Sequence, residues 1–334
     1  MFARPRTWWL ALASTVALVG LVVLSITLTR PPAPVPLPNP NAYDDFLQAG
    51  AAVSGEVGDF PTLDRDALRA LVSTNTESLR LLRLGLTRQC CVPIDAAITN
   101  MSGLLADLAS MKRLAQLLAT EGRLHELDNQ PAAAARAYLD AIRFGNEVSR
   151  GGVVINRLVG IACAAIGRSA LAKLAPRLAP PEARQVLAEL EKVDRSRVTW
   201  EEVQRNEYRY ARHQLRANPN PIWWATALWN LKAGMRRSSE KHSRIVAQER
   251  LLAAELALRC YQSDKARAPA RLDDLVPAYL PQVPQDPFSG QAIVYRPQGA
   301  NWLLYSVGSD GVDNGGRPAA RGPANAGDLR YDVP

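Results

Sequence analysis

Apolar residues recur every three or four positions along most of the chain, a spacing typical of helices with one buried face. The first such segment runs from Thr62 or Asp64, either of which can cap a helix, to about Leu84. The same pattern predicts helices over six further segments: residues 96–118, 131–148, 153–174, 180–193, 199–217 and 245–261. The sequence therefore predicts a mainly α protein.

The segment 153–174 differs from the others because it is apolar almost all round. A helix without a polar face usually lies at the centre of a bundle. The segment carries Arg157, Arg168 and Lys173, so we interpret it as a buried bundle helix and not as a membrane span. Residues 42–58 are small and polar and are expected to be loosely ordered, and residues 122–130 are expected to break or bend the chain.

The pattern changes in the last quarter of the chain. Residues 272–279 predict a short helix or turn, and the closely spaced Pro281, Pro284 and Pro287 exclude regular strand pairing after it. Residues 292–296 and 301–307 then read as two strands joined through a Pro-Gln-Gly turn, which predicts a small antiparallel hairpin. We expect this region to form a small α+β domain beside the helical one.

An uncharged apolar run of 21 residues, 8–28, precedes all of these segments. About 20 such residues suffice to cross a bilayer as a helix. Two arginines precede the run, and after Arg30 the next basic residue is Arg65, which favours a cytoplasmic N-terminus. A cleaved signal peptide is the alternative, but residues 25–30 offer no clear small-residue cleavage site. We expect a single-pass protein of a bacterial cytoplasmic (inner) membrane, with its bulk facing the periplasm.

A proline-rich stretch, residues 31–40, follows the apolar run and favours an extended, semi-rigid spacer. The predicted organisation has five parts. They are a signal-anchor transmembrane helix (1–30), a stalk (31–58), a helical bundle domain (59–240), the α+β domain (241–316) and a Gly/Pro-rich tail (317–334).

The net charge of +8 is unevenly distributed. Residues 195–250 hold 12 Lys and Arg against 5 Asp and Glu, whereas residues 263–334 hold 7 against 8. A basic segment on the periplasmic side can meet anionic headgroups or an acidic partner, and nucleic acid is not expected there. The same segment contains Trp223, Trp224 and Trp229 close to cations, which suits a membrane interface or partner contact, although packing within the protein is the commoner arrangement.

The four cysteines give no metal or redox motif. Outside the membrane they can form disulfides, but Cys90 and Cys91 are adjacent, so we expect them to bond elsewhere and not to each other. Cys163 and Cys260 fall on predicted helices, where a buried free thiol is the ordinary arrangement. No Cys-x-x-Cys pair is present.

Catalytic motifs are equally scarce. The histidines, His125, His213 and His242, have no metal-ligand spacing, and the sequence contains no nucleophile-elbow, phosphate-loop or dinucleotide motif. Three carboxylates, Glu201, Glu202 and Glu207, lie beside Arg205, Arg209 and Arg212 on one predicted helix, which predicts ion pairs on a solvated face. We therefore expect no enzymatic activity, and an envelope hydrolase with its site in the helical domain is the alternative from that class.

The C-terminal motifs occur in a particular order. An Ala- and Leu-rich helix leads into Leu272-Asp-Asp-Leu-Val-Pro, then Asp286-Pro-Phe-Ser-Gly, Ile293-Val-Tyr-Arg and Trp302-Leu-Leu-Tyr-Ser-Val-Gly-Ser-Asp-Gly. This order, over about 75 residues, resembles the C-terminal globular region of type II secretion pseudopilins, especially the major pseudopilin. The resemblance implies a helix that carries a small sheet, and a loop that binds calcium.

The loop in question is residues 309–316, Ser-Asp-Gly-Val-Asp-Asn-Gly-Gly. The resemblance makes Asp310 and Asp313 candidate Ca²⁺ ligands, with Asn314, Asp328 and Asp332 as weaker ones, because calcium prefers hard oxygen donors. The alternative is a Gly-rich surface loop whose Asp and Asn residues only stabilise turns.

Outside this region the chain departs from pseudopilins. Their short leader ends in Gly before an apolar segment with Glu five residues in, whereas Gly20 lies inside the apolar run and Ser25 stands five residues beyond it. We expect a membrane-anchored, non-enzymatic binding or structural protein, within an envelope or secretion assembly. A divergent pseudopilin that enters a filament is the alternative.

Overall fold

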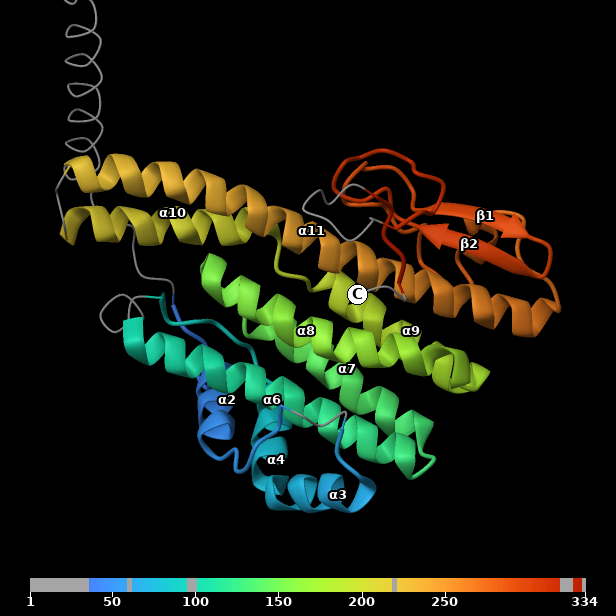
Figure 1. The fold of residues 1–334 in the computed structure, drawn as a ribbon, viewed down its shortest axis with the longest axis horizontal. Coiled ribbons are helices and arrows are strands. Elements are labelled where there is room, and N and C mark those ends of the chain that lie inside the picture. The colour runs from blue at the N-terminus through green and yellow to red at the C-terminus, as the bar shows by residue number, and fades with distance from the viewer. Residues whose placement is uncertain (1–35, 59–61, 95–100, 218–220, 319–326, 332–334) are drawn as a thin grey trace, which may run out of the picture.

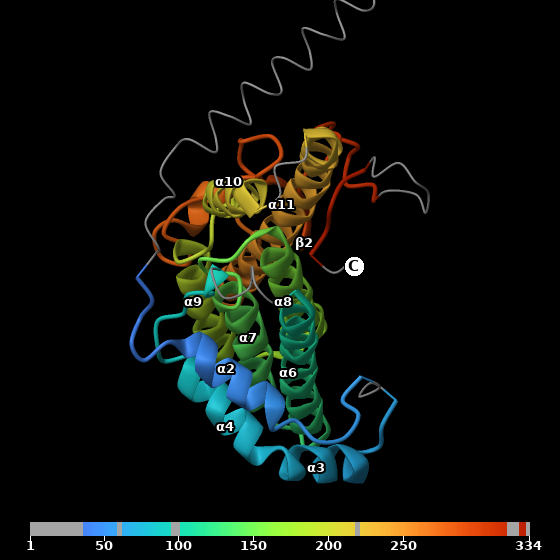
Figure 2. The ribbon, with the colours of Figure 1, turned by 90° about the vertical axis from the view of Figure 1, so that its left-hand side faces the viewer.

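The computed structural model describes residues 36–58, 62–94, 101–217, 221–318 and 327–331. The predicted membrane span 8–28 and the candidate ligand Asp332 lie outside these residues, as do the side chains of Trp223, Trp224 and Trp229. Helices make up most of the described chain, and one two-stranded antiparallel sheet lies near its end, as the sequence predicts. Three layers of helices can be followed in Figures 1 and 2.

The first layer contains α2 (Ala42–Ala51), which corrects the expectation of a loosely ordered segment there. The Asn41 side chain caps this helix by accepting from the backbone N–H of Tyr43 at 3.2 Å, and it also donates to the carbonyl of Cys91 at 2.8 Å. Phe46 is fully buried and packs edge-on against Phe144 with ring centroids 4.9 Å apart. The apolar periodicity did not reveal this helix, because several of its buried positions are alanine or glycine, which carry little apolar signal.

The predicted helix ending near Leu84 is divided into α3 (Arg65–Thr74) and α4 (Thr76–Gly85). Its start is confirmed, since the Asp64 carboxylate accepts from the N–H of Ala67 at 2.8 Å. The break falls at the buried Asn75, whose side chain exchanges hydrogen bonds with the backbone of Ser54 at 2.7 and 2.9 Å. Asn75 thereby ties the two helices to the loop that follows α2.

The middle layer is a bundle of α6 (Met101–Leu127), α7 (Pro131–Glu147), α8 (Val154–Leu174) and α9 (Pro180–Arg195). The expected break at 122–130 is wrong in its first part, because α6 continues to Leu127. Gly122 does not end the helix, since its missing side chain makes room for the Tyr138 ring, whose nearest atom lies 2.3 Å from where a Cβ would stand.

Helices α7 and α8 approach each other through glycines. A Cβ on Gly145 would stand 2.4 Å from the carbonyl oxygen of Gly160, and one on Gly167 would stand 2.4 Å from that of Tyr138. Of the described helices, only α8 with the turn after it (Val154–Arg177) is long and apolar enough to cross a membrane, and 50% of its most apolar window is buried within the protein. Its contacts with α6, α7 and α11 agree with the prediction of a central bundle helix.

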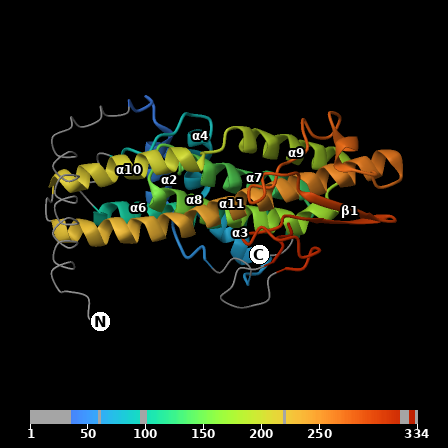
Figure 3. The same ribbon diagram turned by 90° about the horizontal axis from the view of Figure 1, so that it is seen from above.

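The third layer is the antiparallel pair of α10 (Trp200–Ala217) and α11 (Pro221–Lys265). The predicted start of α10 is confirmed, because the Thr199 hydroxyl accepts from the N–H of Glu202 at 3.2 Å. Helix α11 is 45 residues long and passes without interruption through the boundary predicted at 240/241. Seen from above, it runs along most of the length of the molecule, and β1 lies beside its C-terminal half (Figure 3).

The C-terminal segment contains the short 3₁₀ helix η2 (Leu272–Leu275) and the predicted hairpin, β1 (Val294–Gln298) with β2 (Asn301–Tyr305). Val294 pairs with Tyr305, and Gln298 pairs with Asn301. One continuous hydrophobic cluster contains buried residues of α7, α8, α9, α11, η2 and β2. The segment with the pseudopilin-like motifs therefore shares its core with the bundle.

Candidate functional site

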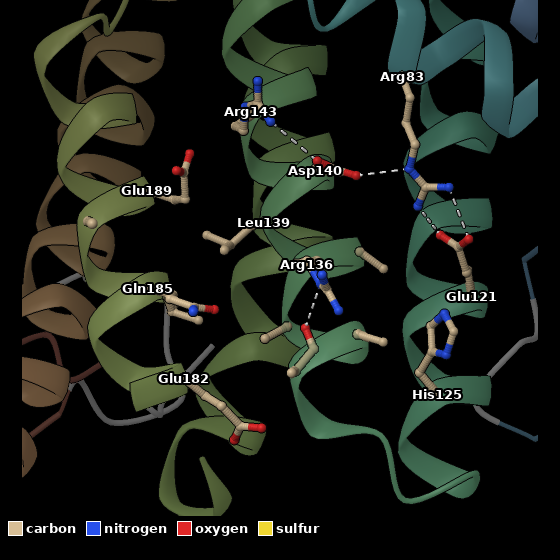
Figure 4. Close-up of a pocket in the computed structure, with 16 residues that line it drawn as sticks. Arg83, Glu121, His125, Arg136, Leu139, Asp140, Arg143, Glu182, Gln185 and Glu189 are labelled. Atoms are coloured by element: carbon tan, nitrogen blue, oxygen red, sulfur yellow. Dashed lines mark hydrogen bonds and ion pairs between the residues drawn. The ribbon is translucent and has the colours of Figure 1, made fainter. Parts of the chain in front are cut away.

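A groove of about 690 Å³ crosses the outer face of α7, between α6 and α9. We call it the α7 groove. Figure 4 shows Glu182, Gln185 and Glu189 along the α9 wall, and Glu121 and His125 along the α6 wall. Its volume is in the range of ordinary ligand pockets, roughly 300–1,000 Å³.

The floor of the α7 groove is built largely from alanines. Its lining includes the following small residues: Ala132, Ala133, Ala135, Ala137 and Ala188. Pro131 stands at the first position of α7, where a missing N–H costs nothing, and the alanine run follows it directly. A floor of methyl groups between two helical walls admits the backbone or small side chains of a bound segment.

Arg83 of α4 closes one end of the α7 groove with a fixed network. Its Nη1 donates to Glu121 at 3.1 Å, its Nη2 bonds the second Glu121 oxygen, and its Nε donates to Asp140 at 3.1 Å. Burial raises the pKa of Asp140, and the adjacent Arg83 opposes this rise. These groups satisfy one another, so we assign them to holding α4, α6 and α7 together.

Arg136 differs from Arg83 because its charge is uncompensated. It is exposed in the middle of the α7 groove, where its Nε donates to the Ala132 carbonyl at 3.3 Å (Figure 4). Among the described residues no carboxylate is in ion-pair contact with it. Arg143, one helical turn beyond Asp140, makes long contacts, at 3.5 Å to Asp140 and 3.4 Å to the Leu86 carbonyl. The α7 groove thus offers a cation, Arg136, to the carboxylate of a bound segment that lies on the apolar floor.

Sequence reasoning missed this site. The residues that matter follow one another at helical spacing as Arg136, Asp140 and Arg143, on a helix whose other faces are buried. A polar stripe that interrupts an alanine-rich helix was the available signal. It did not reveal the walls, since α6 and α9 are brought beside α7 only by the tertiary fold.

The candidate calcium ligands lie in one loop, but their oxygens have partners within the chain. Asp313 accepts from the Tyr305 hydroxyl at 2.7 Å, from the Gly315 N–H at 2.8 Å and from Arg296 at 2.7 Å. These donors lower the pKa of Asp313, the Tyr305 hydroxyl most strongly. Asp310 accepts from the Val312 N–H at 3.1 Å, in a turn at the loop tip.

The weaker candidates are engaged as well. Asp328 is buried, and its two oxygens accept from the N–H groups of Asn314 at 3.3 Å and Gly316 at 2.6 Å. Within the described ranges no three Asp, Glu, His or Cys side chains gather as a metal site requires. The loop as it stands does not fit a preformed calcium site, because a metal would have to displace Arg296 from Asp313. Calcium binding by this loop stays a prediction.

The histidines occupy three different settings. His125 lies at the edge of the α7 groove and contacts Gln130 at 2.9 Å, whereas His213 is exposed on α10. His242 is buried and accepts at Nδ1 from the Nε–H of Arg157 at 3.0 Å. Burial and this arginine lower its pKa to about 3, so it remains neutral at physiological pH while its Nδ1 is occupied by Arg157.

The carboxylates on α10 correct the sequence expectation. Glu202 accepts from the N–H of Gly151 at 3.2 Å, and Glu207 accepts from the N–H of Val154 at 2.8 Å. The solvated-face interpretation is therefore wrong for these two residues, which instead bond free backbone donors before and at the start of α8. Burial raises the pKa of Glu207.

All four cysteines lie in the described part of the chain and carry free thiols. The expectation for Cys163 and Cys260 is confirmed, since both are buried on helices. Cys90 is buried and Cys91 partly exposed. Burial raises the pKa of the Cys90 and Cys91 thiols, which keeps them protonated and poorly reactive at neutral pH.

The α7 groove therefore combines a ligand-sized volume with the exposed Arg136. Comparison with known proteins adds no assignment to it. No protein-family model matches this chain, and no similar protein was found among curated proteins or solved structures.

Proposed function

We propose that this chain is a membrane-anchored, extracytoplasmic binding protein without enzymatic activity, and that the α7 groove holds a segment of its partner. The observation that carries the proposal is the exposed Arg136 on an alanine floor between two fixed walls. A partner segment with small residues against the floor and one carboxylate against Arg136 fits this chemistry. Gln185 on the α9 wall can bond the backbone of that segment.

The apolar run 8–28 supports the anchor, and the unequal basic residues around it support a periplasmic location. Binding at a groove on a rigid bundle is consistent with an envelope or secretion assembly, which needs contact surfaces and not turnover. The pseudopilin-like motifs add to that proposal only through their resemblance.

Site-specific cross-linking tests the α7 groove. A photoreactive residue at position 185 of the full-length protein, expressed in its native membrane, is expected to capture one distinct partner. Arg136→Glu should reduce that product about tenfold or more, since it replaces attraction by repulsion. Arg205→Glu is the matched control, because Arg205 is exposed on α10 and lies outside the α7 groove. Equal capture by both variants would exclude the α7 groove as the binding site.

A divergent pseudopilin is the second candidate. The observation that favours it is α11, a long helix that leads into a small hairpin and packs against it: the Trp302 Nε1–H donates to Glu255 at 2.8 Å. Cleavage after Gly20, detected as a mature N-terminus at Leu21, would favour filament entry over the signal-anchor proposed here.

A further inference from the structure

A second hollow, of about 470 Å³, lies on α11 where the C-terminal loops face it. We call it the α11 basic pocket. It is lined by Arg236, Arg237, Glu240, Lys241, Arg244, Phe288, Ser309 and Leu329. The four cations and the single carboxylate all come from two and a half turns of one helix, so a ligand would meet them together.

The cations of the α11 basic pocket are not neutralised. Arg236, Glu240 and Arg244 follow one another at four-residue spacing, as do Arg237 and Lys241 beside them. No ion pair within the described chain involves any of the four cations. The Nε of Arg244 is moreover buried without a hydrogen-bond partner. A buried donor without an acceptor is costly, which makes an acceptor from a ligand favourable there.

A buried guanidinium of α8 lies near Arg244. Arg168 of α8 is 4% exposed, and its Nη1 donates to the Tyr331 carbonyl at 2.9 Å, while its Nε has no hydrogen-bond partner. Burial lowers the pKa of Arg168, the nearby Glu249 opposes this shift, and Arg244 adds to it. Arg168 and Arg244 each hold a buried Nε–H without an acceptor, which favours an anion that could supply one.

The opposite wall of the α11 basic pocket is apolar and held in place. Buried Asp286 accepts from the N–H groups of Phe288 and Val307, both at 2.9 Å. Ser306 and Leu329 exchange two backbone hydrogen bonds at 2.9 and 2.8 Å. Phe288 and Leu329 are thereby fixed opposite the cations, so little ordering cost attaches to binding between them.

We propose that the α11 basic pocket binds the phosphate group of a phosphate ester whose remaining part is apolar. Arginines and a lysine suit phosphate oxygens through charge-assisted hydrogen bonds. Phe288 and Leu329 take the apolar part, which an inorganic anion lacks. Two sources share this chemistry, a lipid headgroup and a soluble phosphate ester. The pocket is separate from the α7 groove, so either site can exist without the other.

Calorimetric titration of the full-length protein in an uncharged maltoside detergent tests this site. The two probes are phenyl phosphate and phosphatidic acid doped into the detergent micelles. Arg237→Gln/Lys241→Gln is expected to weaken binding about tenfold or more, because two charged hydrogen-bond donors are lost. Glu240→Gln is expected to strengthen it, since among the described residues Glu240 is the one carboxylate that lines the pocket.

The matched control is Arg65→Gln/Arg69→Gln, which removes the same charge from exposed positions of α3, on the side of the molecule opposite α11 (Figure 1). It should bind within about twofold of the wild type, since exposed charges far from a site are largely screened by salt. Binding of phosphatidic acid alone would identify a lipid headgroup, and binding of both probes a soluble ester. The proposal is overturned if neither probe binds, or if the control loses as much affinity as the pocket variant.

Discussion

At the scale of single residues, the buried contact between Arg157 and His242 makes stability depend on pH. Burial and Arg157 lower the pKa of His242 to about 3, below its value of 6.5 in an unfolded chain. Between these two pKa values His242 is protonated in the unfolded state and neutral in the folded state. The folded protein therefore loses stability as the pH falls below 6.5. The expected slope is about 1.4 kcal/mol per pH unit. His242→Gln should remove this part of the acid sensitivity.

The measurement is the free energy of unfolding in urea, at pH 6.5 and pH 5. Carboxylates titrate in both proteins, so the informative quantity is the difference between wild type and variant. We expect His242→Gln to flatten the loss by about 1–2 kcal/mol over this interval. Identical pH profiles would mean that His242 takes up its proton without disturbing the Arg157 contact.

The loop of residues 309–316 gives a second prediction about single residues. If Asp310 and Asp313 hold calcium, the metal must replace Arg296, whose guanidinium now occupies Asp313 at 2.7 Å. Millimolar calcium is therefore expected to raise the melting temperature of Arg296→Gln more than that of the wild type. Asp310→Ala/Asp313→Ala is the control without ligands. If the loop only forms turns, calcium should change the melting temperature of the wild type and of both variants equally.

At the scale of elements, the crossing of α7 and α8 depends on glycine. A Cβ on Gly160 would stand 2.0 Å from the Ser149 hydroxyl and 2.2 Å from the Gly145 carbonyl oxygen. Gly160→Ala should therefore force the helices apart and cost about 2 kcal/mol, even though alanine favours a helix. Gly234→Ala is the matched control on α11, where no atom of the described residues lies within 4 Å of the added Cβ.

The two glycine variants should differ in sign. Gly234→Ala is expected to stabilise the protein by about 0.5–1 kcal/mol, since it lowers only the entropy of the unfolded chain. Urea unfolding of both variants measures the contrast. Two stabilising substitutions would show that α7 and α8 can separate slightly without loss of packing.

Local signals predicted the elements that local physics determines. Asp64 and Thr199 as caps, Pro131 at a helix start and the hairpin of 294–305 each depend on a few neighbouring residues. The failures have a tertiary cause. Gly122 lies inside a helix, where the absence of a side chain leaves room for the Tyr138 ring. Glu207 accepts from the backbone of α8, and the expected ion pair with an arginine of α10 did not predict this contact. The α7 groove was missed for the same reason, since its floor and two walls come from three separate helices and a fourth helix supplies Arg83.

At the scale of the whole molecule, the C-terminal segment is attached to the bundle by polar contacts as well as by the shared core. Arg184 of α9 bonds Asp264 at 2.6 Å, and the Tyr279 hydroxyl donates to the same carboxylate at 2.8 Å. These groups are exposed, so they contribute little energy. The buried cluster matters more, because α11 supplies it along most of its C-terminal half.

A shared core predicts one unfolding transition for the bundle and the C-terminal segment. Leu187 of α9 is 4% exposed and Leu275 of η2 is fully buried, and both belong to the same cluster. Leu187→Ala and Leu275→Ala should each cost about 2–5 kcal/mol and shift the same single transition in calorimetry. Independent domains, divided near residue 240, would instead show two transitions, with each substitution shifting one. Two transitions would require α11 to remain helical across residue 240 while its N-terminal and C-terminal halves lose their packing separately. Because the buried leucines of α11 contact α9 and η2 together, loss of either neighbour is expected to expose the same helix face and unfold the other.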